Sequence, residues 1–545
     1  MKSKMNTLLL LVTVFVCYEA SMSAEAPVAN TTSGKLKGVL HNVYGLKVHA
    51  FLGVPYARPP VEDRRFAKPL PALPSKTVRS ATSYGSICPQ GSSETHEYDA
   101  ISNPSMHEDC LTLNIWAPPR ANESVANKSV MVWIHGGGFK KGHAGQELYE
   151  GAVLSATQDV VVVTLNYRLG YLGFLNTSHP NASGNVGLYD QLLALSWIKD
   201  NIKAFGGNST RVTLFGKGAG AAAIALHVLS PQSVGLFQRV ILQSTDVELS
   251  KYVDDSDTAT KKADALAVEL GCSREGHSIL TSPEDVLECL RSRDPREIIR
   301  AQSDLQDREL GPALPTFGTD FLLQDPASIL EGEALPPVDF LIGHNAEKGK
   351  EVLLTLFPTF LQTSLQNTTM QQIEILFHVL AHTYGFSRTN AEKSLEHYLR
   401  GIDSCNVQAL VDASLKYSTV LATCSSVSLA EKFALAGRNV FYYQSTYTSE
   451  SRQKLGVSVD AFTTSLAFGM PFRLPGRFSD IDRSFSHGVM HTFAHFAKHG
   501  RAPSLNGQAW LKFSTSQPSY FELDPSVMRL RHLDTSGCRY LETLV

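Results

Sequence analysis

Hydrophobic positions form their clearest pattern between residues 128 and 245. Four continuous apolar runs alternate with two stretches of helical character: the runs lie at 130–134, 160–165, 212–215 and 240–243, and the helical stretches at 188–204 and in the alanine-rich segment after residue 218. Apolar runs without polar alternation are typical of strands that are buried on both faces. The pattern therefore predicts an α/β fold with a large, mostly parallel, twisted central sheet and helices on both faces.

Two glycine-rich turns follow strands of this predicted sheet. Residues 135–138 (His-Gly-Gly-Gly) follow the first run, and residues 216–220 (Gly-Lys-Gly-Ala-Gly) follow the third. Ligands of such sheets bind outside the carboxyl ends of the strands, where both turns lie. The second turn lacks the Lys-Ser/Thr ending of a phosphate loop and the spacing of a dinucleotide fingerprint. It has the strand–turn–helix context of a nucleophile elbow, G-x-S-x-G, with Gly218 in the serine position.

The amino terminus predicts a secretory signal peptide over residues 1–24. Lys2 and Lys4 give it a positive start, residues 8–16 are apolar, and small residues precede Glu25. Such a run is too short to span a bilayer, and no later stretch reaches the ~18 apolar residues that a spanning helix needs. We expect residues 25–545 to form a single exported domain without a membrane span. A buried amino-terminal helix is the alternative interpretation.

Sequons and cysteines agree with export. Cys17 lies in the predicted signal peptide, and the seven cysteines that remain are an odd number, so at least one thiol stays outside any internal disulfide. Sequons of the form N-x-S/T predict a glycoprotein. Seven are present, at Asn30, Asn122, Asn127, Asn176, Asn181, Asn208 and Asn367.

The composition excludes several classes of protein. The 545 residues are 43% hydrophobic and 19% charged, close to the globular average, which excludes a disordered, collagen-like or coiled-coil chain. The formal charge of −3 leaves no basic excess to displace the counterions of phosphate groups. Nucleic acid is therefore not expected as a partner.

A series of motifs resembles those of the type-B carboxylesterase/cholinesterase family of α/β-hydrolases. In order, they lie at 51–57, 65–66, 108–114, 135–139, 166–170, 184–191 and 243–244. The resemblance covers nearly the whole mature chain and implies the α/β-hydrolase fold. It also implies an oxyanion hole formed by the backbone N–H groups of Gly137, Gly138 and Ala219.

The same resemblance implies a disulfide pattern. The expected pairs are Cys88–Cys110, Cys272–Cys289 and Cys424–Cys538. Cys405 is left over, either free or intermolecular.

The catalytic triad of this family is missing from its three motif positions. The nucleophile position holds Gly218, the acid position of the G-x-N-x-x-E-G motif holds Lys348, and the histidine position of the G-V-x-H motif holds Val459. Loss of the nucleophile or the base of such a triad lowers turnover about 10⁶-fold. A residual rate of ~10³–10⁴ over water can persist from the oxyanion hole and binding. The resemblance therefore implies an inactive member, akin to glutactin, neurotactin and the neuroligins, which acts by extracellular protein binding or adhesion.

Two other functions stay open: a carrier of a small hydrophobic or anionic ligand in the retained gorge, and an ester hydrolase with a non-standard catalytic set. Ser244 is a candidate nucleophile, although the family has the same serine as scaffold, and His227 and His344 are candidate bases. Lys217 and Lys348 would favour an anionic ligand if both faced the gorge, but we expect each to be a solvated charge. No cofactor or metal is expected.

Four histidines recur at every fourth residue of a helical stretch near the carboxyl terminus. These are His487, His491, His495 and His499. Each step advances only about 40° around a helix, so the four form a slanting stripe. A pair at this spacing can bind zinc or titrate near neutral pH, and a partly solvated stripe on an amphipathic helix is the simpler interpretation. By analogy with the family, residues 477–500 could also contribute to a homodimer.

Overall fold

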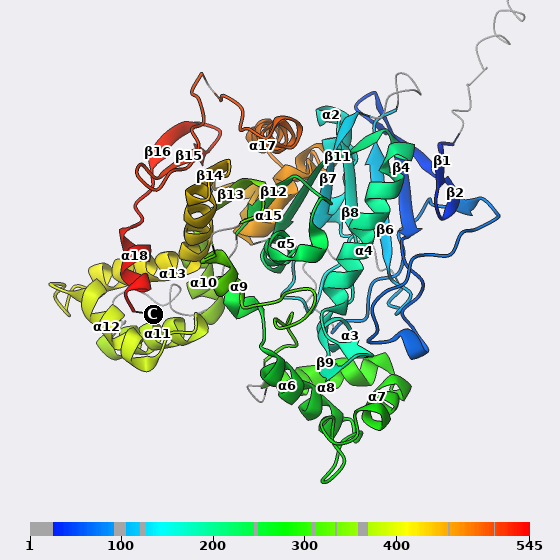
Figure 1. The fold of residues 1–545 in the computed structure, drawn as a ribbon. Helices are drawn as coiled ribbons and strands as arrows, with labels where there is room; N and C mark the ends of the chain where they lie inside the picture. The colour runs from blue at the N-terminus through cyan, green and yellow to red at the C-terminus, as the bar shows by residue number, and fades with distance from the viewer. Residues whose placement is uncertain are drawn as a thin grey trace, which may run out of the picture.

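The computed structural model describes residues 26–91, 105–119, 127–244, 249–307, 311–332, 335–357, 369–455, 458–505 and 507–544. The helices and strands of these segments assemble around one large sheet (Figure 1). The predicted signal peptide over residues 1–24 and the sequons at Asn122 and Asn367 lie outside the described residues.

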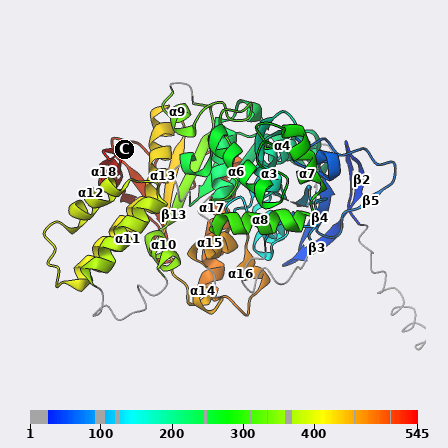
Figure 2. The ribbon, with the colours of Figure 1, turned by 90° about the horizontal axis from the view of Figure 1, so that it is seen from below.

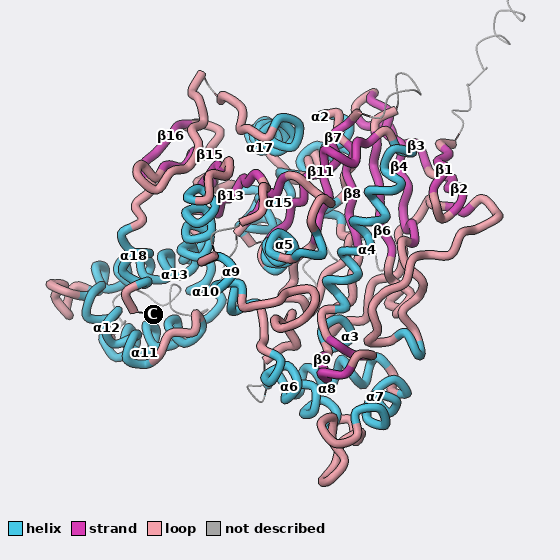
Figure 3. Tube along the Cα trace, viewed as in Figure 1, coloured by secondary structure: helices cyan, strands magenta, loops and turns pink. Residues whose placement is uncertain are grey.

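An eleven-stranded sheet forms the centre of the molecule, in the order β16-β15-β14-β13-β12-β11-β7-β8-β6-β4-β3. Figure 3 shows part of this sheet, with β11, β7, β8, β6 and β4 side by side. Neighbours from β15 to β8 run parallel, whereas β16 at one edge and β6, β4 and β3 at the other pair antiparallel. The predicted mostly parallel sheet is therefore confirmed. Its strands are β3 (Val39–Val43), β4 (Leu46–Pro55), β6 (Thr112–Ala117), β7 (Lys128–Ile134), β8 (Val161–Leu165), β11 (Gly207–Lys217), β12 (Arg239–Gln243), β13 (Asp339–Asn345), β14 (Val440–Ser445), β15 (Ser519–Leu523) and β16 (Arg529–His532).

Alternate side chains of the central strands enter two separate cores on opposite faces of the sheet. In β7, Val130, Val132 and Ile134 pack into the core that holds α4 (Val186–Asn201) and α5 (Ala219–Leu229). Met131 and Trp133 pack into the other core, with α2 (Ala152–Gln158), α15 (Val459–Ala467) and α17 (Asp480–His499). Because both faces are buried, these strands have no polar alternation, which explains the continuous apolar runs in the sequence.

Further helices extend from the two ends of this arrangement. Figure 2 shows α11 and α12 at the end of the molecule opposite β2 and β5.

Among the described residues, no helix is both long and apolar enough to cross a membrane. The remaining elements are β1 (Val28–Thr31), β2 (Gly34–Lys37), β5 (Arg79–Ser80), α3 (Gly170–Phe174), β9 (Asn176–His179), β10 (Ala182–Ser183), α6 (Ser256–Glu269), α7 (Pro283–Ser292), α8 (Pro295–Asp307), α9 (Pro326–Leu330), α10 (Lys348–Leu356), α11 (Met370–Thr383), α12 (Arg388–Leu399), α13 (Val407–Leu435), α14 (Glu450–Leu455), α16 (Met470–Arg473) and α18 (Ser536–Glu542).

Three disulfides join the pairs that the family resemblance implies: Cys88–Cys110, Cys272–Cys289 and Cys424–Cys538. The first two close short loops, and the third closes a loop of 114 residues that ties α18 to α13. A disulfide typically stabilises a fold by about 2–4 kcal/mol. Cys405 is exposed and forms no disulfide within the chain.

A buried arginine–aspartate pair joins two of the sequence motifs. Nε and Nη2 of Arg168 donate to the two carboxylate oxygens of Asp190 at 2.8 and 2.7 Å, and the backbone N–H of Arg168 donates to the same carboxylate at 3.1 Å. The two side chains are 4% and 0% exposed. This bidentate geometry fixes the segment after β8 against the first turns of α4.

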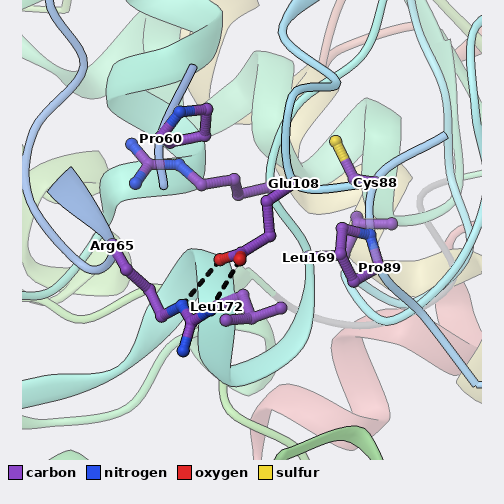
Figure 4. Close-up of a pocket in the computed structure, with 8 residues that line it drawn as sticks. Pro60, Arg65, Cys88, Pro89, Glu108, Leu169 and Leu172 are labelled. Carbon is purple, nitrogen blue, oxygen red and sulfur yellow. Dashed lines mark hydrogen bonds and ion pairs between the residues drawn. The ribbon is translucent and has the colours of Figure 1, made fainter. Parts of the chain in front are cut away.

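A second ion pair connects the amino-terminal segment to α7. Nε and Nη2 of Arg65 donate to the two carboxylate oxygens of Glu108, each at 2.6 Å, and Nη1 donates to the backbone oxygens of Arg291 and Arg293 at 2.8 and 2.6 Å. Figure 4 shows the two bonds between Arg65 and Glu108 beside the small cavity that these side chains line with Arg168. The arginine and glutamate of these two motifs thus hold separate parts of the chain together.

Replacing Asp190 by asparagine is expected to destabilise the fold by about 3–5 kcal/mol, because it leaves the Arg168 charge buried without its partner. Urea unfolding of the purified variant measures the loss. The matched control is Glu392→Gln, which breaks the exposed Arg388–Glu392 pair on α12 and should cost less than about 1 kcal/mol. Equal losses in the two variants would contradict this role for Asp190.

Candidate functional site

The candidate site lies at the carboxyl ends of β7, β11, β12 and β13. These strands are parallel neighbours, so the turns that follow them emerge at the same edge of the sheet. Backbone bonds tie these turns together: Gly218 N donates to Gln243 O at 3.1 Å, and Ser244 N donates to Gly343 O at 2.8 Å. Backbone hydrogen bonds therefore link the ends of β11, β12 and β13 at this edge of the sheet.

Gly218 forms the turn between β11 and α5. Its φ of 55° and ψ of −122° lie in a region that L side chains rarely adopt, so glycine relieves strain that any other residue would have there. A Cβ built on Gly218 meets no heavy atom within 4 Å in the described structure. The turn thus has the strand–turn–helix geometry of a nucleophile elbow and room for a side chain, but no hydroxyl.

The glycine loop after β7 packs directly against this turn. A Cβ on Gly136 would lie 2.5 Å from the carbonyl oxygen of Lys217, and a Cβ on Gly220 would lie 2.2 Å from the carbonyl oxygen of Ile134. Real Cβ atoms do not approach backbone oxygens so closely. Glycine is therefore required at both positions for the two turns to meet.

The three expected oxyanion-hole residues lie where these turns meet. Gly137 and Gly138 have φ values of 108° and 63°, which favour glycine, and follow the contact that Gly136 makes with the elbow. Ala219 is the first residue of α5, and its backbone N lies 3.8 Å from the Cβ position of Gly136. Their role as anion donors stays a prediction.

The position expected for the catalytic acid holds a buried lysine. Lys348 begins α10 directly after β13, is 6% exposed, and its Nζ lies 3.7 Å from Oε2 of Glu351. The expectation of a solvated charge is therefore wrong for Lys348. The first turn of α10 is enclosed because it packs closely against α13: a Cβ on Gly349 would lie 2.5 Å from the backbone N of Thr419.

Glu347, one residue before the expected acid position, faces basic side chains. Its carboxylate oxygens lie 3.6 Å from Lys350 Nζ and 3.5 Å from Arg452 Nη2. These contacts give the carboxylate a structural explanation that does not require a histidine.

The histidine position falls at the start of α15. Val459 is the first residue of this helix, but its side chain and residues 456–457 lie outside the described part of the structure. One turn later, Thr463 Oγ1 donates to Asn345 Oδ1 at 2.8 Å, which places α15 against the carboxyl end of β13. The segments that contain Gly218, Lys348 and Val459 therefore meet the same edge of the sheet.

A narrow cavity lies among these segments, and it has no room for a water molecule. It includes the candidate nucleophile Ser244 and the candidate base His344, whose Nδ1 lies 3.0 Å from the hydroxyl of Tyr442. None of the described residues that line it is an aspartate or glutamate, the residue type that orients the histidine of a triad. The lining residues are Lys217, Gln243, Ser244, His344, Asn345, Tyr443 and Thr463.

The other candidate base, His227, lies near the far end of α5. Its ring nitrogens lie 3.0 Å from Gln191 Oε1 and 2.8 Å from Ser233 Oγ. Because the amide oxygen can only accept, Nε2 bears the hydrogen and Nδ1 accepts from the serine hydroxyl. Both nitrogens are thus used within the core, and His227 is structural.

Burial lowers the pKa of three histidines. The pKa falls to about 3 for His135 and His227 and to about 4 for His143, with desolvation as the largest cause in each. These side chains are therefore neutral in the folded protein at neutral pH.

The described sequons differ in exposure. Asn30, Asn127 and Asn181 are exposed and Asn208 is half-buried. Asn176 is only 3% exposed, and its Oδ1 accepts from the backbone N–H of Ser178 at 2.8 Å. Its burial argues against a glycan at Asn176.

The four predicted histidines line one face of α17. His487, His491 and His499 are exposed and His495 is half-buried, while Met490, Phe493, Phe496 and Ala497 enter the core as expected. Ring centroids are 5.8 Å apart for His491–His495 and 4.6 Å apart for His495–His499. In the described part of the chain, no group of three or more histidine, cysteine, aspartate or glutamate side chains could hold a metal ion.

Together, the eleven-stranded sheet, the elbow and the adjacent glycine loop define a protein of the α/β-hydrolase fold. The family model described as the carboxylesterase family matches residues 25–540, and the chain belongs to that family. It is 33% identical to acetylcholinesterase-1 of Trittame loki over 95% of this chain and 94% of that protein. It is 32% identical to the cholinesterase of Mus musculus over 92% of this chain and 84% of that protein.

Substitutions at the two elbow glycines are expected to differ in cost. Gly218→Ala should destabilise the fold by about 1–3 kcal/mol, because space is available and only the backbone is strained. Gly220→Ala should cost more, since its Cβ overlaps the Ile134 carbonyl oxygen. Urea unfolding of both variants checks the order, and a larger loss for Gly218→Ala would contradict it.

Stability is expected to fall in acid because of the buried histidines. Their folded-state pKa values lie below the unfolded value of about 6.5. Their contribution to the free energy of unfolding is therefore complete above that pH and is lost as pH falls toward 3–4. Each should remove about 1.4 kcal/mol per pH unit within this window. Urea unfolding between pH 7 and 4 should show a shallower pH dependence in His227→Gln than in the wild type. The exposed control His532→Gln should keep the wild-type slope.

Proposed function

We propose that this carboxylesterase-family protein is a secreted glycoprotein without ester hydrolase activity, which acts by binding an extracellular protein, as in adhesion. In this proposal residues 1–24 are removed as a signal peptide, and residues 25–545 act as one domain. The three disulfides and the exposed sequons are consistent with an oxidising, extracellular setting.

The observation on which the proposal depends is the glycine at the elbow. Gly218 occupies the strained turn between β11 and α5 at the carboxyl edge of the sheet, where an α/β-hydrolase presents its nucleophile. Glycine offers no oxygen to attack a carbonyl carbon. Without that atom, the donors of Gly137, Gly138 and Ala219 have no acyl intermediate to stabilise.

The other two motif positions support the same conclusion. Lys348, in the acid position, is a buried cation beside Glu351 and could not stabilise an imidazolium. Val459, in the histidine position, has no proton acceptor. Three independent losses in one site are difficult to reconcile with a working triad.

Retention of the scaffold favours a role for the surface. The disulfides, the Arg168–Asp190 pair and the close glycine contacts of the elbow are all intact. A protein that needed only its fold would keep these features while losing its catalytic groups. Protein binding by the esterase-like surface is consistent with this combination.

Ester hydrolysis by other residues is the second candidate. The relatives are named as acetylcholinesterase and cholinesterase, and Ser244 and His344 line one cavity in this chain. Two observations weigh against it: none of the described lining residues is a carboxylate, and Gly218, where space is open, is not among them.

A carrier of a small anionic or hydrophobic ligand is the third candidate. Lys217 lines the cavity with Gln243, which is 3% exposed and whose amide atoms bind no other described group. These groups are polar enough for a small anion, but the cavity has no room for a water molecule, which weighs against this candidate. Lys348, paired with Glu351, contributes less to such a site than the sequence suggests.

Restoring the triad should restore the chemistry. The variant Gly218→Ser/Lys348→Glu/Val459→His should react with a fluorophosphonate probe at a stoichiometry near one, because the serine again has a base and an orienting acid. The variant also carries Glu351→Gln, because Glu351 lies 3.7 Å from Lys348 and would repel the new carboxylate at position 348. Intact mass spectrometry measures the adduct.

Two matched proteins control this experiment. The same variant with alanine in place of serine at position 218 should remain unlabelled, and the wild type should remain unlabelled and hydrolyse ester substrates no faster than the alanine variant. A stoichiometric adduct on the wild type would overturn the proposal, and peptide mapping would then identify the reacting serine. Pull-down with the wild type from extracellular matrix tests protein binding separately.

A further inference from the structure

A row of basic side chains on the outer face of α17 has no part in the proposed function. Two of its members come from outside the helix: Arg501 follows α17, and Arg211 lies on β11, where its Nη2 donates to the backbone oxygen of Lys498 at 2.8 Å. We call this row the α17 basic strip. It comprises His491, His495, His499, Lys498, Arg501 and Arg211, of which His491, His499 and Arg501 are exposed and the others are half-buried.

Two carboxylates near the strip are already paired. Asp159 pairs with Lys128 on β7. Asp339 lies 3.8 Å from Nε of Arg239, and Nη1 of the same arginine donates to the backbone oxygen of Ala497 at 3.1 Å. Each carboxylate is thus accompanied by a basic side chain, and the strip keeps its positive charge.

Among the described residues, other elements that pack near α17 add little negative charge. The side chain of Asp460 on α15 lies outside the described part. At the start of α17, Asp482 accepts hydrogen bonds from Tyr447 and Ser451. The remaining acidic groups are paired as follows: Glu522 with Arg529 and Arg531, Glu147 and Glu150 with Arg473, and Asp480 with Arg483.

Two histidines of the strip, His491 and His499, are poised to gain charge when pH falls. Partial burial, and then the neighbouring basic groups, lower the pKa of His491 and His499. The charges that act on His499 come from His495, Arg501, Lys498 and Arg211 and are all basic. The lowered pKa values favour neutral rings of His491 and His499 near neutral pH, and an anion laid along these two rings would favour their protonation.

The shape of the strip fits an extended polyanion. His491 and His499 are separated by two helical turns, about 12 Å along the axis, and Arg501 continues the row beyond the helix. Ile481 is the only large apolar side chain of α17 among the exposed described residues, and it lies at the opposite end of the helix. The strip thus lacks the apolar side chains that a membrane-surface helix inserts.

We propose that the α17 basic strip binds a linear sulfated polysaccharide, more tightly as pH falls below neutrality. Repeated sulfate groups on an extended chain match a row of cations, and release of counterions supplies the affinity. The proposal rests on the extracellular location in the proposed function but not on the absence of catalysis. Ester hydrolysis by the wild type would overturn the latter and leave polysaccharide binding unaffected.

The experiment measures binding of the full chain to immobilised heparin at about pH 5.5 and about pH 7.5 over a series of salt concentrations. The wild type should bind about tenfold more tightly at the lower pH. The variant His491→Gln/His495→Gln/His499→Gln should lose this pH dependence and keep the affinity at neutral pH. Lys498→Gln/Arg501→Gln should weaken binding about tenfold at both pH values and reduce the salt dependence.

A matched control removes two arginines elsewhere. Arg388→Gln/Arg400→Gln lies on the exposed surface of α12 and just beyond it, and should bind like the wild type. Equal weakening by this control, or wild-type binding by both strip variants, would overturn the proposal. Phosphatidylserine vesicles and duplex DNA are tested in parallel: weaker strip-dependent binding to both is expected, and tighter binding to either would also overturn it. Circular dichroism confirms that every variant is folded.

Discussion

Burial of both faces of the parallel strands is the constraint on which this structure depends. It forces β7 to send Val132 into one core and Trp133 into the other, and it requires helices on each side. Because the strands are parallel, their carboxyl ends share one edge, and the turn at Gly218 meets the glycine loop there. The position of the site is thus a result of how the hydrophobic cores are built.

The contact between the two turns also shows which glycines of the site are set by packing. Gly136 and Gly220 are fixed by carbonyl oxygens less than 3 Å from any Cβ they might bear, whereas the space around Gly218 is open. Packing therefore requires glycine at residues 136 and 220 but leaves room for a side chain at residue 218. A hydroxyl at residue 218 is a requirement of catalysis alone, and glycine there removes backbone strain.

Much of the fold could be predicted from the sequence, because apolar runs report burial directly. The strands at 130–134 and 240–243 and the helix around the histidine stripe occur as expected. The strand predicted at 212–215 begins earlier, at Gly207. The prediction missed this part because residues 208–211 are polar and lie at an irregularity in the pairing with β7. The antiparallel edge strands gave no comparable apolar signal.

The environment of single side chains was harder to predict, since it depends on distant segments. Lys348 is buried because α13, about seventy residues later, covers the first turn of α10, and no local pattern indicates this. Asn176 is likewise enclosed although its sequon resembles the exposed ones. Gly218, by contrast, was recognisable at once, because its flanking glycines and the strand before it define the turn.

The covalent link between Cys424 and Cys538 has a consequence for a chain that a protease has cut. A protease that cut the exposed connection at Ser516 or Gln517 would break the chain inside the loop that this bridge closes. The two fragments would remain attached, with β15, β16 and α18 still joined to the body. A nicked molecule would therefore remain one particle and separate only where the disulfide is reduced.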